Sequence, residues 1–290
     1  MQKRTSRAAK GYYTSLLCLC FMLPLCAHTE DIAESIPAAA DRAHVTIIID
    51  DLGYSMPPAE AILQLAYPLT LAIIPFTPYG KRIAQAANAI EKEVMLHAPM
   101  ETLATNKWEN GLSVSMDEIE LLSTMDAMLT DIPYVVGVNN HGGSKLTQDH
   151  SRMDWVMNFL AQRQLFFIDS RTTAASIAVE AAKNNAIAYS ERDVFIDNEK
   201  SQEYIENQLQ TLFKIALKQG KAIGIGHPYP ETSRALQNTL PQLQKAGIRL
   251  VSASKMVGAN NTSTSLAFEP AKTDQKPTRN GVRTHILYVD

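Results

Sequence analysis

Cysteine is almost absent from this chain of 290 residues, and its three cysteines, Cys18, Cys20 and Cys26, all lie near the N-terminus. The rest of the chain therefore cannot form a disulfide, a thiolate metal site or a cysteine nucleophile. A protein that works where thiols oxidise gains by carrying none. Any metal held by the rest of the chain must be bound by histidine and carboxylate side chains.

The chain also lacks an excess of basic charge, a second long apolar run and two common hydrolase motifs. Its 27 basic and 30 acidic residues give a net charge of −3, so no nucleic-acid partner is expected. Beyond the N-terminal segment, no apolar run is long enough to predict a stable membrane span. The motif G-x-S-x-G does not occur, so the sequence does not support a serine hydrolase with a nucleophile elbow. The motif H-E-x-x-H does not occur either, so it does not support a zinc metalloprotease of that kind.

The first 27 residues have the three parts of a secretory signal peptide. A head with four basic residues precedes the apolar run Tyr12–Cys26, and Leu25-Cys26-Ala27 supplies a cleavage end. An uncleaved anchor or a buried helix fits the basic head less well, and the bulk of Leu25 disfavours lipoprotein acylation at Cys26. We expect cleavage and export to the periplasm. The loss of four basic residues and no acidic one would take the net charge from −3 to −7.

Composition divides the remaining chain into one domain with irregular ends. Residues 28–43 are rich in alanine and acidic residues and predict a flexible leader. Residues 258–290, rich in Asn, Thr, Ser, Lys and Pro without periodicity, predict a disordered tail. Residues 44–257 contain no linker and no repeat, so we expect a single folded domain there.

Short apolar runs alternate with helical stretches through this domain. Most of the runs are continuously apolar, which is typical of strands buried on both faces of a parallel sheet. Seven or eight such βα units predict an α/β fold, a distorted (β/α)7–8 barrel that is closed or nearly so, with an open doubly wound sheet as the alternative. The expected strands are Val45–Ile49, Leu69–Ile74, Val94–Leu96, Tyr134–Val138, Leu165–Ile168, Ala186–Tyr189, Ala222–Ile225 and Ile248–Val251.

Several helix ends are also marked in the sequence. A capping box at Ser115–Glu118 predicts a helix that continues to Leu129. Thr147 or Asp149 can cap a helix that continues through Leu160. The amphipathic stretch 202–219 should end at Gly220. Pro241 should divide a last helical segment, Ser233–Ala246.

Acidic residues and histidines gather where the predicted strands end. Three of the seven histidines, His97, His141 and His227, follow predicted strands, as do Asp50-Asp51 and Asp169-Ser170-Arg171. Each residue alone could be a helix cap or a satisfied polar group. In both candidate folds, however, the carboxyl ends of the strands carry the functional groups. The set as a whole therefore predicts a functional site at one rim.

The adjacent pair Asp50-Asp51 points to metal chemistry. Two carboxylates cannot both be buried and ionised unless a cation or hydrogen-bond donors compensate them. A divalent metal on one of them removes that cost and leaves the other free as a base. An Asx turn before Gly53 is the alternative, and it would occupy only one of the two.

Three other segments supply candidate ligands and donors. His97 and Glu101 are four residues apart, but Pro99 disfavours a helix there, so joint chelation would need a turn. In the expected loop 139–144, Asn140, Gly143 and Ser144 are candidates for contacts with a substrate or an oxyanion, since the two glycines permit a close backbone approach. The loop lacks the lysine spacing of a phosphate-binding loop. The segment Gly224-Ile225-Gly226-His227-Pro228 presents its histidine as a proton donor.

Five motifs in this order resemble those of the divergent polysaccharide deacetylases. They are Ile48-Ile49-Asp50-Asp51-Leu52-Gly53, Leu96-His97-Ala98-Pro99-Met100-Glu101, Gly137-Val138-Asn139-Asn140-His141-Gly142-Gly143-Ser144, Phe167-Ile168-Asp169-Ser170-Arg171-Thr172 and Gly224-Ile225-Gly226-His227-Pro228. The resemblance covers about Val45 to Val257. It implies a distorted (β/α) barrel and metal-dependent hydrolysis of N- or O-acetyl groups on a glycan.

The resemblance also implies roles for individual residues. Asp50 matches the general base, Asp51 a metal ligand, and His227 the late histidine that acts as acid. His97 matches the first of two metal-binding histidines four residues apart, but Glu101 stands at the second position. Our hypothesis is a divalent metal of the Zn²⁺ type on Asp51 and His97, with His141 or Glu101 as the third ligand.

Two further points complete the hypothesis. Arg171, beside Asp169, would orient or tune Asp50 or His227. The Arg-x-Pro-Tyr segment of other polysaccharide deacetylases is absent, and residues 139–144 stand near its place. The alternative is a catalytically inactive barrel that binds a glycan or an envelope protein through the same rim. The change at position 101 favours that alternative, whereas the aspartate pair and His227 favour the enzyme.

Overall fold

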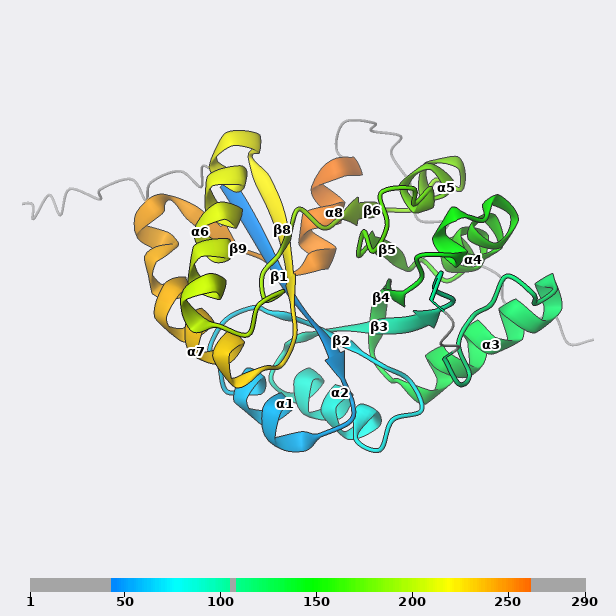
Figure 1. The fold of residues 1–290 in the computed structure, drawn as a ribbon, viewed down its shortest axis with the longest axis horizontal. Helices are drawn as coiled ribbons and strands as arrows, with labels where there is room; N and C mark the ends of the chain where they lie inside the picture. Colours follow the sequence, from blue (N-terminus) through cyan, green and yellow to red (C-terminus); the bar gives the residue numbers. More distant parts are fainter. Residues whose placement is uncertain (1–42, 105–107, 262–290) are drawn as a thin grey trace, which may run out of the picture. The chain divides into compact units, whose positions relative to one another are not determined.

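The apolar runs fold into one curved sheet in the part of the chain that the computed structural model describes, residues 43–104 and 108–261 (Figure 1). Eight strands follow the order β6-β5-β4-β3-β2-β1-β8-β7, β9 pairs with β1, and every pairing is parallel. The strands are β1 Ala43–Leu52, β2 Thr70–Ile73, β3 Glu93–Met100, β4 Val135–Gly142, β5 Phe166–Asp169, β6 Tyr189–Glu191, β7 Val194–Phe195, β8 Lys221–Gly226 and β9 Ile248–Leu250. The barrel-like α/β fold is confirmed as a curled half-barrel whose edge strands are β6 and β7.

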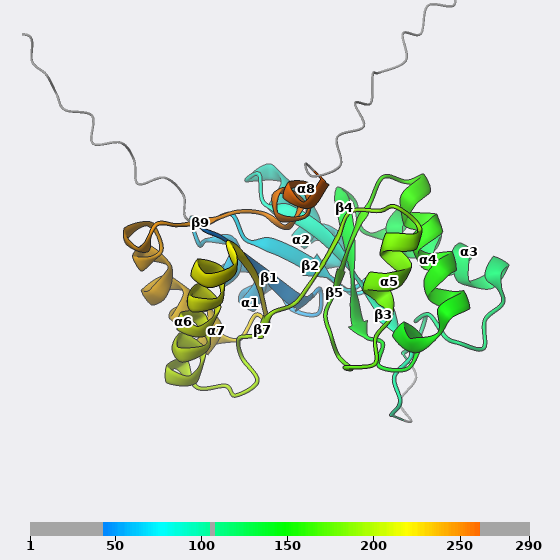
Figure 2. The same ribbon diagram turned by 90° about the horizontal axis from the view of Figure 1, so that it is seen from above.

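All of the α-helices except the last cover the outer face of the sheet, and the last lies against its inner face (Figures 1 and 2). The α-helices are α1 Met56–Leu63, α2 Gly80–Ala89, α3 Glu118–Asp131, α4 His150–Gln162, α5 Ala178–Asn184, α6 Gln202–Gln219, α7 Pro230–Thr239 and α8 Ala253–Asn261. Short 3₁₀ turns cover Leu146–Gln148, Leu240–Gln242 and Gln244–Ala246. Among the described residues, no helix is long and apolar enough to cross a membrane.

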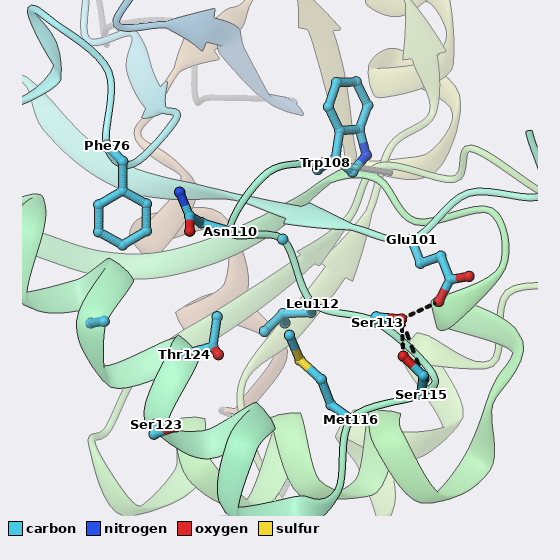
Figure 3. Close-up of a pocket in the computed structure, with 12 residues that line it drawn as sticks. Phe76, Glu101, Trp108, Asn110, Leu112, Ser113, Ser115, Met116, Ser123 and Thr124 are labelled. Atoms are coloured by element: carbon cyan, nitrogen blue, oxygen red, sulfur yellow. Dashed lines mark hydrogen bonds between the residues drawn. The ribbon is translucent and has the colours of Figure 1, made fainter. Parts of the chain in front are cut away.

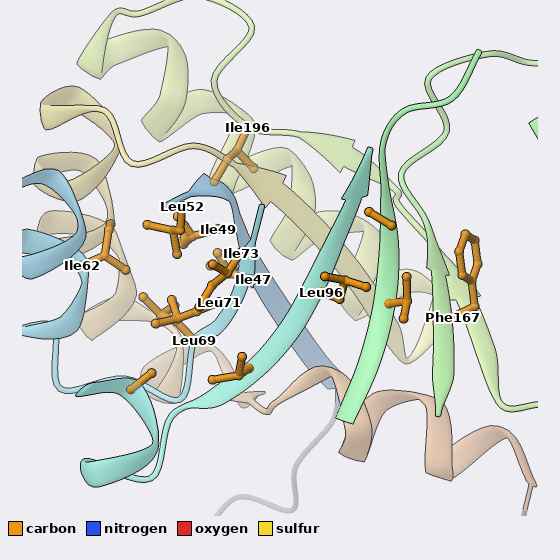
Figure 4. Close-up of a cluster of buried hydrophobic side chains, with 14 of the residues drawn as sticks. Ile47, Ile49, Leu52, Ile62, Leu69, Leu71, Ile73, Leu96, Phe167 and Ile196 are labelled. Carbon is orange, nitrogen blue, oxygen red and sulfur yellow. The ribbon is translucent and has the colours of Figure 1, made fainter. Parts of the chain in front are cut away.

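The alternation of side chains along the strands builds two separate hydrophobic cores. Ile47 and Ile49 of β1 pack toward the outer helices together with residues such as Ile62 of α1 (Figure 4). Ile48, between them, belongs to a smaller cluster that lies inside the curve of the sheet and includes Met256 of α8. Because both faces of β1 are buried here, the strand is continuously apolar from Ile47 to Ile49, just before Asp50.

The same alternation places a polar layer directly after the inner core. Strand residues two positions apart share a face, so Asp50 follows Ile48, and His97 follows Met95, on the inner side of the sheet. The β3–β4 register pairs His97 with Asn139 and Pro99 with His141, which puts Asn139 and His141 on this side too. The carboxyl ends of the strands therefore gather polar groups inside the mouth of the half-barrel.

One predicted helix start needs correction, and the structure decides between the two caps that were predicted for another helix. The capping box of α3 is formed by Asp117 and Glu120, two residues later than predicted, because Ser115 is hydrogen-bonded to Ser113 instead. Asp149, and not Thr147, caps α4, since the Thr147 hydroxyl donates to the Gly143 carbonyl.

The later helix ends agree more closely with the sequence. Helix α6 ends at Gly220 with φ 84°, as predicted. Helix α7 begins at Pro230, three residues before the predicted start, and it ends before Pro241. Helix α8 continues to Asn261, so the first residues of the predicted tail are helical. The predicted signal peptide, nearly all of the leader and residues 262–290 lie outside the described residues.

Candidate metal and catalytic site

The end of β1 turns two adjacent carboxylates toward the same point. The register between β1 and β2 shifts between Ile49 and Leu52, and Asp51 has φ 58°, a left-handed conformation that aspartate tolerates better than most residues. Asp50 continues the inward alternation of the strand. The Asp50 Oδ2 and Asp51 Oδ1 atoms consequently lie 3.6 and 3.2 Å from the same atom, His97 Nε2.

Three ligand atoms converge at this point. Asp51 Oδ1 lies 2.9 Å from His141 Nδ1, and the two imidazole nitrogens, His141 Nδ1 and His97 Nε2, are 3.1 Å apart. Ligands of a tetrahedral zinc ion at about 2.1 Å would be separated by about 3.4 Å. The buried Asp51 Oδ1 forms no hydrogen bond of acceptable geometry with either nitrogen. The group Asp51, His97 and His141 therefore fits a divalent cation.

Asn139 connects this group to the neighbouring carboxylate. Its Oδ1 lies 2.8 Å from His97 Nδ1, and its Nδ2 donates to Asp50 Oδ1 at 2.8 Å. With the amide in this orientation, His97 carries its proton on Nδ1 and directs the lone pair of Nε2 toward the cation position. Such second contacts commonly fix the tautomer of a metal-binding histidine.

The two aspartates have opposite pKa shifts. Burial raises the pKa of Asp50, and the neighbouring His97 and Asn139 lower it by less. Burial also raises the pKa of Asp51, but its contacts with His141 and His97 outweigh that effect and hold the pKa well below the ordinary range. Asp51 is therefore suited to bind a cation as a carboxylate, and Asp50 to accept a proton.

His227 faces the same point from the end of β8. Its Nδ1 lies 2.9 Å from Asp197 Oδ1, and its Nε2 lies 3.6 Å from Asp51 Oδ2. Burial disfavours the charged imidazole, but the hydrogen bond and charge of Asp197, with the charges of Asp51 and Asp50, raise the pKa of His227. Asp197 is itself fixed by the Thr232 hydroxyl. The ring is thus held as a proton donor that faces the cation position.

The structure does not bring Glu101 to this group. One carboxylate oxygen lies 2.7 Å from Lys145 Nζ, and the other accepts from the Ser113 hydroxyl and the Val114 amide at 2.6 and 2.8 Å. The reason is that β3 remains extended through Met100, and residues four apart in a strand are about 13 Å from each other. Of the two alternatives for the third ligand, His141 lies in place and Glu101 does not.

The three residues expected to contact a substrate or an oxyanion are used inside the protein. Asn140 donates to the Gly142 carbonyl and accepts from the Ser170 amide. The Gly143 amide donates to the Met100 carbonyl, and the Ser144 hydroxyl accepts from the Leu103 amide. The predicted loop is largely strand, because β4 continues to Gly142 along β3.

Asp169 and Arg171 also lie outside the cation group. The Asp169 carboxylate accepts from the Arg171 amide and the Ser176 hydroxyl, so it stabilises the turn after β5. The Arg171 side chain pairs with Glu191 at 3.4 Å. Arg192, which the sequence did not single out, donates to the Ser170 and Arg171 carbonyls at 2.7 and 2.9 Å. Burial lowers the pKa of Arg192, and the charges of Asp169 and Asp50 oppose that shift.

Replacing Asn139 by Ala is expected to weaken metal binding by about 10- to 100-fold, as changes at second contacts of metal ligands do. The variant removes the partner of His97 Nδ1 and one donor to Asp50. Chelator competition on the purified variant measures the change. Asn140→Ala, in which only contacts to backbone groups are lost, is the control. Equal metal affinity in the Asn139 variant and the wild type would contradict the positioning role.

Replacing Glu101 by Gln should lower stability and leave metal content unchanged. Hydrogen bonds from Lys145 and Ser113 lower the pKa of Glu101 from 4.5 to about 2. Its stabilisation is therefore complete above pH 4.5 and is lost as the pH falls toward 2. We expect a loss of about 1–2 kcal/mol at pH 7, since Lys145 is partly exposed. Urea unfolding should show that the difference in free energy of unfolding between wild type and variant is smaller at pH 3 than at pH 7. Loss of metal from the variant would instead show that Glu101 is a metal ligand.

A curled parallel half-barrel with an Asp–His–His group at its mouth is typical of the polysaccharide deacetylase class of α/β proteins. Residues 47–257 match the family described as divergent polysaccharide deacetylase, and the chain belongs to that family.

The chain is also similar to two bacterial proteins in sequence and to a third in fold. YibQ of Escherichia coli (strain K12) is 32% identical over 235 residues, which cover 81% of this chain and 73% of YibQ. A Haemophilus influenzae protein is 32% identical over 203 residues, which cover 70% of this chain and 72% of that protein. A crystal structure of an Agrobacterium tumefaciens protein is similar in fold, with a TM-score of 0.71 at 24% identity over 74% of this chain and 89% of that one.

Proposed function

We propose that this protein is an exported, metal-dependent deacetylase that removes acetyl groups from an envelope glycan. The observation that carries the proposal is the convergence of Asp51, His97 and His141 beside Asp50 and His227. Family membership supports the reaction class. Export is proposed from the basic head and apolar run at the N-terminus.

The residues around the cation position divide the work of acetyl hydrolysis. A divalent cation held by Asp51, His97 and His141, most simply Zn²⁺, would supply Lewis acidity and lower the pKa of water. Asp50, with its raised pKa, would take the proton from the attacking water. His227, kept protonated by Asp197, would give a proton to the leaving nitrogen or oxygen. Asn139 would hold the side chains of Asp50 and His97 in their positions through its two hydrogen bonds.

The inactive-barrel alternative receives less support from this geometry. It was favoured by the carboxylate at position 101, where related enzymes are expected to carry a second metal-binding histidine. His141 supplies an imidazole to the group from the neighbouring strand β4, so a three-ligand set is present without Glu101. An open three-ligand site is typical of catalytic zinc rather than structural zinc.

The direct test is metal analysis of the purified protein followed by an acetate-release assay. We expect about one equivalent of divalent metal, and acetate release from chitooligosaccharides or peptidoglycan fragments that stops on chelation and returns with Zn²⁺. Bound metal without acetate release from either glycan would favour the inactive barrel. Acetate release that persists after complete chelation would contradict a metal-dependent reaction.

A further inference from the structure

A hollow of about 450 Å³ lies at the amino end of the strands, at the opposite end of the half-barrel from the cation group. Its size is within the range of about 300–1,000 Å³ that is common for small-molecule sites. Four of its lining residues have basic side chains, and no described residue of the lining is acidic. The four are His44, Lys221, Arg249 and Lys255, and we call this site the basic hollow.

Three of these side chains come from neighbouring strands and share one register. The β1–β8 pairing sets His44 beside Lys221, and the β1–β9 pairing sets His44 beside Arg249 (Figure 1). In each strand an adjacent residue belongs to the outer hydrophobic core, namely Val45, Ala222 or Ile248. Because side chains alternate between the two faces of a strand, His44, Lys221 and Arg249 all lie on the inner face.

Helix α8 supplies the fourth basic side chain. The helix packs against the inner face of the sheet through Ala253 and Met256, which belong to the inner hydrophobic core. Lys255 precedes Met256, is exposed, and lines the basic hollow together with the strand residues. Val251 and Met256 give the lining an apolar part. The fold therefore gathers basic groups from three strands and one helix around one space.

The basic groups repel one another in this arrangement. His44 and Lys221 are partly buried, and salt screens partly buried charges much less than exposed ones. An anion bound among the four groups would offset the repulsion, in the way that a cation would offset it between Asp50 and Asp51.

The carboxylates near the basic hollow lie outside its lining. Asp193 lines a separate hollow that Lys221 also borders. Burial raises the pKa of Asp193, and a backbone hydrogen bond and the charge of Lys221 oppose that shift. Glu91 and Glu93 line a third hollow with Lys255, and Glu93 accepts from the backbone at the start of α8. Asp193 therefore offsets part of the charge of Lys221, and the lining of the basic hollow keeps an excess of positive charge.

This set of groups suits a phosphomonoester. The Arg249 guanidinium presents a planar fork that can bind two phosphate oxygens at once, whereas a lysine ammonium binds phosphate as a point charge. A phosphomonoester carries about −1.5 to −2 charges near pH 7, which matches Lys221 and Lys255 better than a single carboxylate does. The hollow is larger than inorganic phosphate needs, so the apolar part of its lining is available to the organic part of the ester.

The cavity between α3 and the segment after β3 does not share this character (Figure 3). Glu101 is the one charged residue in its described lining, and its carboxylate accepts from the Ser113 hydroxyl. Trp108, which also belongs to the lining, lies near the catalytic group, with its ring centroid 4.2 Å from that of His141. An anionic ligand is therefore expected at the basic hollow and not at this cavity.

We infer that the basic hollow binds a phosphomonoester, with Arg249, Lys221 and Lys255 holding the phosphate. This binding is independent of the proposed deacetylation, because the hollow lies at the other end of the strands from the metal ligands. The ester is a soluble phosphorylated molecule or the head group of a lipid, since the same phosphate chemistry occurs in both. Binding at this end leaves the mouth of the half-barrel open to its substrate.

Substitution of one basic residue tests the site. Lys255→Gln removes an exposed cation of the lining, and Lys214→Gln, at an exposed position of the outer helix α6, makes the same change outside the hollow. The probes are glycerol 3-phosphate, in calorimetry at constant ionic strength, and vesicles of phosphatidic acid and phosphatidylcholine in equal parts, in co-sedimentation. We expect the wild type and Lys214→Gln to bind alike. Lys255→Gln should bind about tenfold more weakly, because one charge-assisted hydrogen bond is lost.

The two probes also distinguish the sources of the ester. A selective loss in Lys255→Gln with glycerol 3-phosphate supports a soluble ligand, and a selective loss with the vesicles alone supports a lipid head group. Absence of binding by either probe would overturn the site. So would equal binding by Lys255→Gln and the wild type, as expected for a phosphate held by the catalytic metal. Equal weakening in Lys255→Gln and Lys214→Gln, as expected for adsorption to surface charge, would overturn it too.

Discussion

Replacing Asp51 by Asn is expected to remove the bound metal and the deacetylase activity together. The variant loses the only carboxylate of the three-ligand group while keeping the two imidazoles. Replacing a residue that hydrogen-bonds to a metal ligand typically lowers metal affinity by about 10- to 100-fold. Loss of a direct ligand should therefore lower it by at least about 100-fold. Turnover should fall by more than about 10³-fold, because the Lewis acidity is lost with the metal.

The design of this variant separates metal loss from misfolding. Asparagine adopts positive φ readily, so the φ of 58° at position 51 is kept. Thermal unfolding should be insensitive to added Zn²⁺ in the variant, whereas the wild type should be stabilised by it, since a ligand that binds only the folded state raises stability. Unchanged metal stoichiometry in Asp51→Asn would refute the ligand assignment.

Replacing Asp50 by Asn is expected to lower turnover by about 10²–10⁴-fold while the metal stays bound. Asp50 is nearly fully buried and lies outside the three-ligand group, so the amide should not change metal stoichiometry. It cannot accept a proton from water, and the loss of a general base costs about 10²–10⁴ in rate. An asparagine at this position can still accept the hydrogen bond from Asn139 Nδ2, so the site geometry should persist.

Metal analysis and acetate release on the same preparation measure both effects of this substitution. Loss of metal from the Asp50→Asn variant would show that Asp50 is itself a metal ligand. Activity near the wild-type value would remove Asp50 from the reaction and leave proton transfer to another group. The two variants should therefore differ: Asp51 should control the metal content, and Asp50 only the rate.

Much of the fold and part of the site follow from local patterns in the sequence. Continuous apolar runs predicted buried parallel strands, and most strands formed where expected. The exceptions are β6, which overlaps its expected run Ala186–Tyr189 only at Tyr189, and β7, which has two residues and so no detectable pattern. Period-two alternation also places most of the functional side chains, but not Asp51, which its left-handed backbone turns toward the same point. Asp50 lies two residues after Ile48, and His227 two residues after Ile225, so each shares the inner face of the sheet with that isoleucine. The polar layer inside the mouth could therefore be derived from the alternation of side chains along the strands.

The rest of the site depends on where strands end and on contacts between distant segments. The choice of His141 over Glu101 as the third ligand depends on β3 remaining extended through Met100. The expected strand ended at Leu96, and Pro99 gave no sign that the strand continues. Asp197 could have been found, because Ile196-Asp197 repeats the Ile168-Asp169 pattern after a short apolar run. The positions of Arg192 and Trp108 could not, since each comes from a segment that tertiary packing folds back toward the mouth.

The most direct test of the account is an anomalous diffraction map of zinc-loaded crystals, recorded at the zinc absorption edge. We expect one peak inside the mouth of the half-barrel, within about 2.0–2.2 Å of an Asp51 oxygen, His97 Nε2 and His141 Nδ1. A peak coordinated by Glu101, or zinc bound only at surface side chains while those three atoms stay without metal, would contradict it.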